Sequence, residues 1–229
     1  EKVYNAASRK AGPGFKGRMF ARAVAAARQW SRDEQNGVAH SPKQLAERAT
    51  FETLVYRTVR GALGPNIKYV ACGGAPLAED LAHFYAGIGL PMIQGYGMTE
   101  TAAPFTVTRI HDNRIGTVGQ PAPGGSIRIA DDGEVQVHGD NVFVGYHNLP
   151  EKTAEAFTPD GWLKTGDLGS IDDDGRLTIT GRKKDIIITA GGKNVSPIPL
   201  EQEIAECPIV EHAVVVGDGR PFIGALVTL

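Results

Sequence analysis

The segment Gln94-Gly95-Tyr96-Gly97-Met98-Thr99-Glu100 begins at the end of a short apolar run, Pro91–Gln94, that is typical of a β-strand. A second β-type run, Ile67–Ala71, precedes it and leads into Gly73-Gly74, and Ala78–Gly87 between the two runs is typical of a helix. Strand, glycine turn, helix and strand in this order predict a βαβ unit in a mostly parallel sheet. Such sheets place ligands at the carboxyl ends of their strands, which is where this segment begins.

The first 60 residues are predicted to be helical and basic. Apolar side chains recur at near-helical spacing over Phe15–Trp30, and Ser41-Pro42 is an N-cap and first-position proline for a helix from Lys43. Gly61 and Gly64-Pro65 are expected to end this region. It holds 12 Lys and Arg against 5 Asp and Glu, whereas the other 169 residues hold 12 and 21. We favour packing against other parts of the protein as the reason, over contact with an anionic membrane surface.

After residue 104 the pattern changes to short alternating strands. Ser126–Ala130 and Glu134–His138 predict one hairpin, and Gly169–Ile171 with Leu177–Thr180 predicts a second. Together these features predict a β-rich, barrel-like subdomain.

From residue 182 onward a short run, a helix from Ser196 or Pro197 and two further strands predict the start of a small α+β domain. The expected domains are therefore residues 1–104, 105–181 and 182–229. The fold class is α/β with part of a parallel sheet, a β-rich subdomain and an incomplete α+β domain.

Composition excludes several classes of function. No apolar run reaches the ~20 residues that a membrane-spanning helix needs, and no nucleic-acid-binding signature is present, so a cytoplasmic location is expected. Cys72 and Cys207 are expected to be reduced and buried as small apolar side chains. Asp172-Asp173-Asp174-Gly175 resembles a calcium loop, but Arg176 stands at the fifth ligand position, so a solvated hairpin turn is predicted.

The side chains of residues 94–100 suit a nucleotide. Gly95 and Gly97 allow close approach of the backbone to a flat ligand, and Tyr96 offers an aromatic face to a purine. Thr99 offers a hydroxyl to a phosphate, and Glu100 offers a hard oxygen to Mg²⁺. The alternative is an ordinary strand-to-helix turn with an incidental glutamate.

Two further segments carry candidate chemistry. Leu163-Lys164-Thr165-Gly166-Asp167 presents a carboxylate, expected on a tight turn, that can accept hydrogen bonds from both hydroxyls of a ribose. Gly181-Arg182-Lys183-Lys184-Asp185 is a basic segment between the β-rich part and the terminal domain; a solvated turn is its plain alternative.

These three segments, in this order and at this spacing, resemble the adenylate-forming enzymes, which include acyl-CoA synthetases, firefly luciferase and the adenylation domains of peptide synthetases. The resemblance implies a fold, ATP or AMP as ligand, and Mg²⁺ at Glu100. It implies catalytic roles for Thr99, Glu100 and Arg182, a ribose contact for Asp167, and a hinge whose pivot is Lys184. The remaining implied ligand contacts are Gly73, Gly74, Ala75 and Pro76 at an adenine wall, Gln94, Gly95, Tyr96 and Gly97 at the adenine, and Gly191 and Gly192 at the pantetheine channel of CoA.

Within this family, Glu1–Asn5 and the long basic helical segment resemble long-chain fatty acyl-CoA synthetases, and Met98-Thr99-Glu100 favours CoA ligases. The implied reaction joins a fatty acid to CoA through an acyl-adenylate. The family's phosphate loop and its C-terminal lysine find no match, so we expect a fragment that makes no acyl-CoA alone.

Alternatives remain open: a catalytically dead, membrane-associated or regulatory relative, a fatty-acyl-AMP ligase, or another carboxylate-adenylating enzyme. The acyl chain length and oligomeric state are not predicted. For peripheral membrane contact, the candidate side chains are Phe15, Lys16, Arg18, Phe20, Arg22, Trp30 and Arg32.

Overall fold

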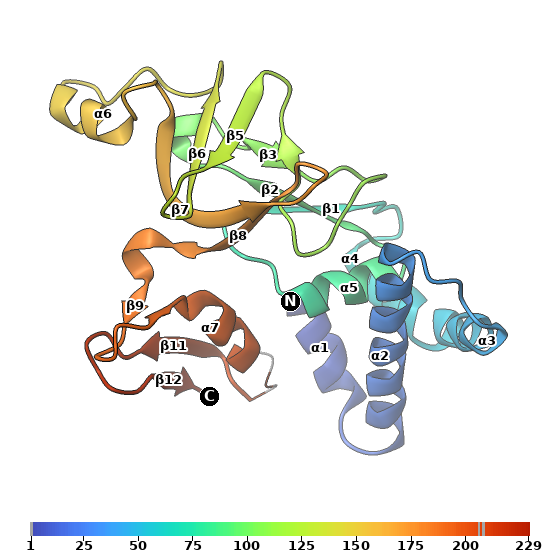
Figure 1. Ribbon diagram of the computed structural model, residues 1–229. Helices are drawn as coiled ribbons and strands as arrows, with labels where there is room; N and C mark the ends of the chain where they lie inside the picture. The colour runs from blue at the N-terminus through green and yellow to red at the C-terminus, as the bar shows by residue number, and fades with distance from the viewer. Residues whose placement is uncertain (1, 206, 208) are drawn as a thin grey trace. The chain divides into compact units, whose positions relative to one another are not determined.

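The computed structural model describes residues 2–205, 207 and 209–229, and the chain forms two compact units (Figure 1). Unit 1 comprises Glu1–Gly95 and Thr108–Gly116, and unit 2 comprises Tyr96–Val107 and Thr117–Leu229.

Unit 1 is a helical layer beside a pair of parallel strands. Its elements are α1 (Lys2–Ala11), α2 (Phe15–Gln35), α3 (Pro42–Phe51), a π-helix (Glu52–Tyr56), α4 (Arg57–Leu63), β1 (Val70–Gly73), α5 (Glu79–Gly87) and β2 (Met92–Tyr96). β1 and β2 pair in parallel from Val70 opposite Met92 to Gly73 opposite Gly95, with α5 between them in sequence. The predicted βαβ unit is thereby confirmed.

The helix signals of the first 60 residues are confirmed with one exception. Ser41 caps α3 by accepting a hydrogen bond from the Gln44 backbone N–H, and the Gln44 side chain returns one to the Ser41 backbone, which completes a capping box. Gly61 was expected to end the helical region, but it lies inside α4. Gly64 ends that helix instead, because its φ of 131° is open to glycine and strained for other residues.

Helices α2 and α5 cross so closely that one glycine is required. A Cβ at Gly87 would lie 1.9 Å from the Ala27 carbonyl oxygen of α2. Around this crossing lies the core of unit 1, to which the Tyr56 hydroxyl adds a hydrogen bond of 2.8 Å to the Ala23 carbonyl. The fully buried aromatic and aliphatic side chains there include Phe84, Ile88, Leu90 and Tyr56.

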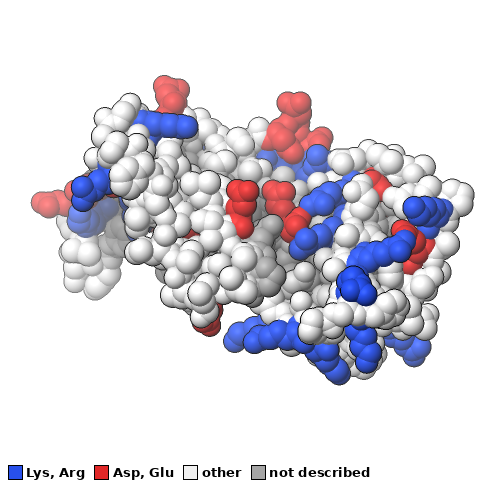
Figure 2. All heavy atoms as spheres, turned by 90° about the horizontal axis from the view of Figure 1, so that it is seen from below, with Lys and Arg blue, Asp and Glu red and all other residues white. Residues whose placement is uncertain are grey.

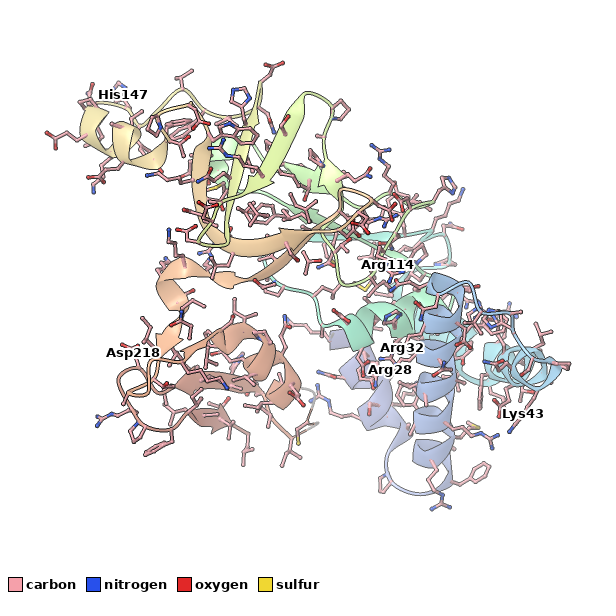
Figure 3. The ribbon with its side chains drawn as sticks, in the orientation of Figure 1. Arg28, Arg32, Lys43, Arg114, His147 and Asp218 are labelled. Carbon is pink, nitrogen blue, oxygen red and sulfur yellow. The ribbon has the colours of Figure 1, made fainter. Side chains whose placement is uncertain are left out.

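Charged side chains tie the same two helices together (Figure 3). Arg28 and Arg32 of α2 both pair with Asp80 of α5, and the Arg28 Nη1 lies 2.7 Å from the carboxylate. Beside them Ser31 Oγ lies 3.0 Å from the buried His83 Nδ1. Burial, with a further contribution from Arg32, lowers the pKa of His83, which favours the neutral imidazole. These pairs agree with the expectation that the basic segment packs within the protein.

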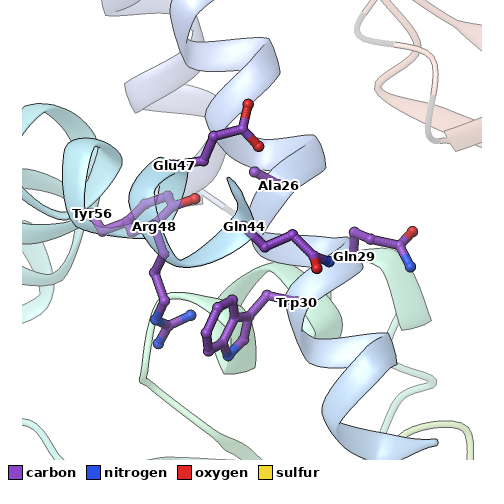
Figure 4. A pocket seen from close by; sticks show the side chains of 7 residues that line it. All are labelled: Ala26, Gln29, Trp30, Gln44, Glu47, Arg48 and Tyr56. Carbon is purple, nitrogen blue, oxygen red and sulfur yellow. The ribbon is translucent and has the colours of Figure 1, made fainter. Parts of the chain in front are cut away.

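Helix α2 meets α3 around a stacked tryptophan (Figure 4). The Trp30 ring lies between the His40 ring, whose centroid is 3.4 Å away, and the Arg48 guanidinium, 4.2 Å from the Trp30 centroid. A small pocket of about 80 Å³ lies beside it, lined by Ala26, Gln29, Trp30, Gln44, Glu47, Arg48 and Tyr56. Trp30 is therefore part of an internal contact between helices.

Unit 2 is built on an antiparallel meander in which β5 (Gly125–Ile129), β6 (Glu134–Gly139), β7 (Leu163–Ile171) and β8 (Leu177–Arg182) pair in sequence order. The short strands β3 (Thr106–Val107) and β4 (Gln120–Pro121) also pair with each other. A 3₁₀ turn, Lys183–Asp185, leads into β9 (Ile187–Ile188), β10 (Asn194–Val195), α7 (Pro197–Ala205), β11 (His212–Val216) and β12 (Gly224–Thr228). Both predicted hairpins and the predicted order of the terminal elements are confirmed.

Two sequence interpretations in unit 2 were wrong. Residues 163–167 were expected to form a tight turn, but they lie inside β7, where Gly166 has a φ of 73° and the pairing register shifts on both sides. Glycine there marks a bulge, which re-aims the side chain of Asp167. Helix α6 (Pro150–Ala156) was also missed, although Pro150 at its first turn and Glu, Lys and Ala within it are helix signals.

The two cysteines are free, and their surroundings differ from the expectation. Cys72 is half-buried, and burial raises the pKa of its thiol. Cys207 is exposed, so its interpretation as a buried apolar side chain was wrong. Among the described residues, no helix is long and apolar enough to cross a membrane.

We expect Gly87→Ala to lower the free energy of unfolding of this chain by about 1–3 kcal/mol, because the added methyl group overlaps the backbone of Ala27. Urea unfolding followed by circular dichroism measures the change. Gly61→Ala is the matched control: it lies in α4 with open space around its Cβ, and it should stabilise by up to about 1 kcal/mol. Equal effects of the two substitutions would contradict the packing argument.

Candidate functional site

The centre of the candidate site in unit 2 is the buried carboxylate of Asp167, whose side chain is 7% exposed. Its Oδ2 accepts a 2.7 Å hydrogen bond from the Tyr96 hydroxyl, and its Oδ1 accepts one of 3.0 Å from Arg182 Nε. A buried carboxylate is costly unless it is paired, and these donors supply the pairing. The structure therefore brings together one residue from each of the three sequence segments.

The bulge of β7 fixes the direction of this carboxylate. Thr165 Oγ1 donates to the Val135 carbonyl and accepts from the Asp167 backbone N–H, while the Gly166 N–H donates to Glu134 Oε1. Each carboxylate oxygen has more than one lone-pair site, so Asp167 retains acceptor capacity beside its two protein partners. A ligand diol is the kind of group that such a carboxylate can receive.

Tyr96 is a hydrogen-bond donor held in its neutral form. Burial is the main cause that raises the pKa of its phenol far above the ordinary value, and the Asp167 carboxylate adds to the rise. The neighbouring glycine has a packing role: a Cβ at Gly97 would lie 2.8 Å from the Phe105 backbone nitrogen. Close approach to a ligand was the expected reason for Gly97, and close approach to the chain itself is a second one.

The turn that carries Thr99 and Glu100 is a single 3₁₀ turn, Thr99–Thr101. Thr99 is exposed, and the Glu100 side chain accepts a 2.8 Å hydrogen bond from the Tyr146 hydroxyl. This contact joins residues 46 positions apart, and no local pattern in the sequence indicates it. Tyr146 is a candidate functional residue that sequence reasoning missed.

The basic segment after β8 is anchored by the residue next to the expected pivot. Lys183 Nζ lies 2.5 Å from Asp132 Oδ2 and 3.2 Å from Glu134 Oε2, and these partners raise its pKa. Lys184, the expected pivot, is exposed. The chain thus has a fixed point at Lys183 directly before the proposed hinge residue.

The remaining predicted contact residues lie apart from this centre in the chain. Gly191 and Gly192 form the turn between β9 and β10, where the Gly192 N–H bonds to the Thr189 carbonyl at 2.8 Å. Their part in a CoA channel stays a prediction. Gly73, Gly74, Ala75 and Pro76, with Gln94 and Gly95, belong to unit 1, and their contact with adenine likewise stays a prediction.

Comparison with family models identifies the class of protein. Residues 18–147 match the model of the AMP-binding enzyme family, and residues 184–229 match that of the AMP-binding enzyme C-terminal domain. The chain therefore belongs to the AMP-binding enzyme family, which confirms its resemblance to the adenylate-forming enzymes.

Curated relatives match over the whole chain. The sequence is 53% identical, over 231 aligned residues, to long-chain-fatty-acid–CoA ligase FadD15 of Mycobacterium bovis, and the match covers 100% of this chain and 38% of the relative. It is 39% identical to long-chain-fatty-acid–CoA ligase ACSBG1 of Homo sapiens over 187 residues, or 77% of this chain and 25% of the relative. The chain thus spans well under half the length of these relatives.

Solved structures share the fold. O-succinylbenzoate coenzyme A synthetase (MenE) of Bacillus subtilis, in complex with ATP and magnesium ion, is 30% identical with a TM-score of 0.64, covering 75% of this chain and 40% of the other. MatB of Rhodopseudomonas palustris, in the apo form, is 37% identical with a TM-score of 0.57, covering 78% of this chain and 38% of its own.

We predict that this chain binds AMP weakly and that Asp167→Ala weakens binding at least about 10-fold, because the ribose loses a charged acceptor worth ~1.5–3 kcal/mol. Equilibrium dialysis with labelled AMP measures the change. Asp173→Ala, which removes an exposed carboxylate from the β7–β8 turn, should leave binding unchanged. Equal affinities of the Asp167 and Asp173 variants, both folded by circular dichroism, would contradict the ribose assignment.

Proposed function

We propose that this chain is part of a long-chain fatty acid–CoA ligase. The observation that carries the proposal is the 53% identity over the whole chain to a protein of that name. The centre formed by Tyr96, Asp167 and Arg182 supports it, because these three residues were expected at the nucleotide and lie within hydrogen-bond distance of one another.

The reaction proceeds in two steps. A fatty carboxylate oxygen attacks the α-phosphorus of ATP, pyrophosphate leaves, and an acyl-adenylate forms. The CoA thiolate then attacks the acyl carbon, and AMP leaves as the thioester forms. Asp167 holds the ribose through both steps, Arg182 supplies positive charge beside it, and Thr99 donates its hydroxyl to the α-phosphate.

Magnesium fits this arrangement as a companion of the ATP phosphates. Among residues 2–205, 207 and 209–229, no group of three or more His, Cys, Asp or Glu side chains stands ready to hold a metal ion. Mg²⁺ commonly takes one or two protein carboxylates and fills its shell with phosphate oxygens and water. Glu100 is the carboxylate that we assign to it, and the ion supplies charge neutralisation at the phosphates.

Two other candidates make different products. A fatty-acyl-AMP ligase completes only the first step in the presence of CoA, and a catalytically dead relative completes neither. Measurement of each half-reaction therefore separates all three.

The decisive experiment uses the full-length ligase that contains this segment. We expect Glu100→Ala to lower ATP–pyrophosphate exchange at least about 10²-fold, because charge stabilisation at the phosphates is lost. We expect Lys184→Pro to spare exchange and to block thioester formation, because proline locks a φ angle that must change at a hinge.

Lys184→Ala is the matched control for the hinge, since it removes the same side chain and leaves φ free. Single-turnover measurement of acyl-AMP and acyl-CoA separates the steps. Normal exchange in the Glu100 variant would overturn the metal assignment, and equal behaviour of the proline and alanine variants would overturn the hinge assignment.

We further propose peripheral contact with an anionic membrane surface through a groove of about 530 Å³ between α2 and α3. Arg18, Arg22 and Lys43 line it beside Phe15, which is 75% exposed, and Leu54, which is 52% exposed. Figure 2 shows basic side chains gathered over these helices. Phe20 and Arg32, which were expected on this face, are excluded, because Phe20 is in the core and Arg32 pairs with Asp80; Trp30 is held in the stack between α2 and α3.

Flotation of the full-length ligase with liposomes tests this contact. We expect binding to phosphatidylserine-containing vesicles that weakens in high salt and in the double variant Arg18→Glu/Arg22→Glu. Lys68→Glu, the same change of charge at an exposed site before β1, should bind as the parent does. Binding that is indifferent to anionic lipid content would exclude the proposal.

A further inference from the structure

Glu100 and Tyr146 form a pair that no sequence motif connects. The Tyr146 hydroxyl lies 2.8 Å from Glu100 Oε1, and the phenol is 37% exposed. Glu100 is the residue that the proposed function assigns to Mg²⁺. A donor on one oxygen of that carboxylate bears directly on how the other oxygen is presented.

Tyr146 is itself held in place by the start of α6. Its backbone N–H donates to Thr153 Oγ1 at 2.9 Å, and that hydroxyl donates to the Leu149 carbonyl at 3.0 Å. Gly145 precedes it with a φ of 148°, and a Cβ there would lie 2.6 Å from the Thr153 side chain. The edge of the Tyr146 ring also packs on Phe143, with ring centroids 4.8 Å apart. This support fixes the phenol and is more than a freely moving surface tyrosine would have.

The same loop holds the backbone of the Glu100 turn. The Phe143 N–H donates to the Glu100 carbonyl at 2.8 Å, and Asn141 Nδ2 donates to the Thr101 carbonyl at 2.9 Å. Three donors from residues 141–146 therefore converge on residues 100–101, two at the backbone and one at the carboxylate. Position and rotation of the carboxylate are both set by this loop.

The chemistry of the pair suits a metal ligand. The hydrogen bond to Glu100 is the largest cause that raises the pKa of Tyr146, so the phenol stays neutral and donates. Donation to Oε1 favours the ionised carboxylate and restricts its rotation. Groups of this kind, which hold a ligand without touching the metal, commonly change metal affinity about 10- to 100-fold when they are removed.

We propose that Tyr146 is a positioning residue that aims Glu100 at the Mg²⁺ carried by ATP. The inference rests on the proposed function, and it adds a residue from outside the three segments that the resemblance assigns. Tyr146 acts only through Glu100 and contacts neither the phosphates nor the reacting atoms. Its removal should therefore change the magnesium requirement more than the maximal rate.

The experiment is ATP–pyrophosphate exchange by the full-length ligase, measured at saturating fatty acid and ATP over a range of free Mg²⁺. We expect Tyr146→Phe, which removes only the hydroxyl, to raise the half-saturating Mg²⁺ concentration about 10-fold. At saturating Mg²⁺ the rate should return to within about 2-fold of the parent, because the metal then holds Glu100 by itself. Tyr69→Phe, at an exposed tyrosine of unit 1, is the control for loss of a phenolic hydroxyl.

Three outcomes distinguish the inference from its foundation. An unchanged Mg²⁺ curve in Tyr146→Phe, with a clear shift in Glu100→Gln, overturns the role of Tyr146 and leaves the metal assignment standing. An unchanged curve in Glu100→Gln overturns the metal assignment itself. A fall in rate at every Mg²⁺ concentration without a shift in half-saturation shows a merely structural role for Tyr146, which also overturns the inference.

Discussion

The buried carboxylate of Asp167 is the constraint on which the candidate site depends. It draws Tyr96, 71 positions away, and Arg182, 15 positions away, to a single point in unit 2. Because the side chain is 7% exposed, loss of either donor would leave a charge short of partners in a place where water cannot replace them. The end of β2, the bulge of β7 and the end of β8 are therefore fixed relative to one another by a single side chain.

The site repeats this device at its second carboxylate. Asp167 and Glu100 each accept from a tyrosine hydroxyl, and each carboxylate raises the pKa of its phenol. The two pairs differ in exposure: Tyr96 is deeply buried beside a carboxylate that also pairs with Arg182, whereas the Tyr146 phenol is partly open to water. A buried pair suits a contact that persists through a reaction, and a partly open pair suits a ligand that must receive and release an ion.

Local signals in the sequence predicted most of the fold. Ser41-Pro42 predicts the start of α3, the glycine turns delimit the βαβ unit, and the Asp-rich turns predict both hairpins, because each of these features is decided within a few residues. Gly166 misled the prediction, since a glycine with positive φ inside a strand gives the same local signal as one in a turn. Phe20 and Arg32 misled it as well, because helical spacing alone does not state which neighbour an amphipathic face will meet.

The candidate site was predictable only in part. Tyr96, Asp167 and Arg182 were identified through a family resemblance, and the structure adds the hydrogen bonds between them. Tyr146 and Lys183 were missed because their partners are 46 and about 50 positions away, and contacts of that range follow from the tertiary fold.

The anchor at Lys183 makes the start of the terminal domain sensitive to ionic strength. Lys183 and Asp132 are about half exposed, so mobile ions screen their attraction over the ~8 Å Debye length of physiological salt. The Asp167 carboxylate, one residue away across the β7–β8 ladder, is shielded from such ions by burial. Added salt therefore loosens the outer fastening of this joint first and leaves the inner one intact, so the freedom of the terminal domain varies with the medium while the nucleotide centre keeps its geometry.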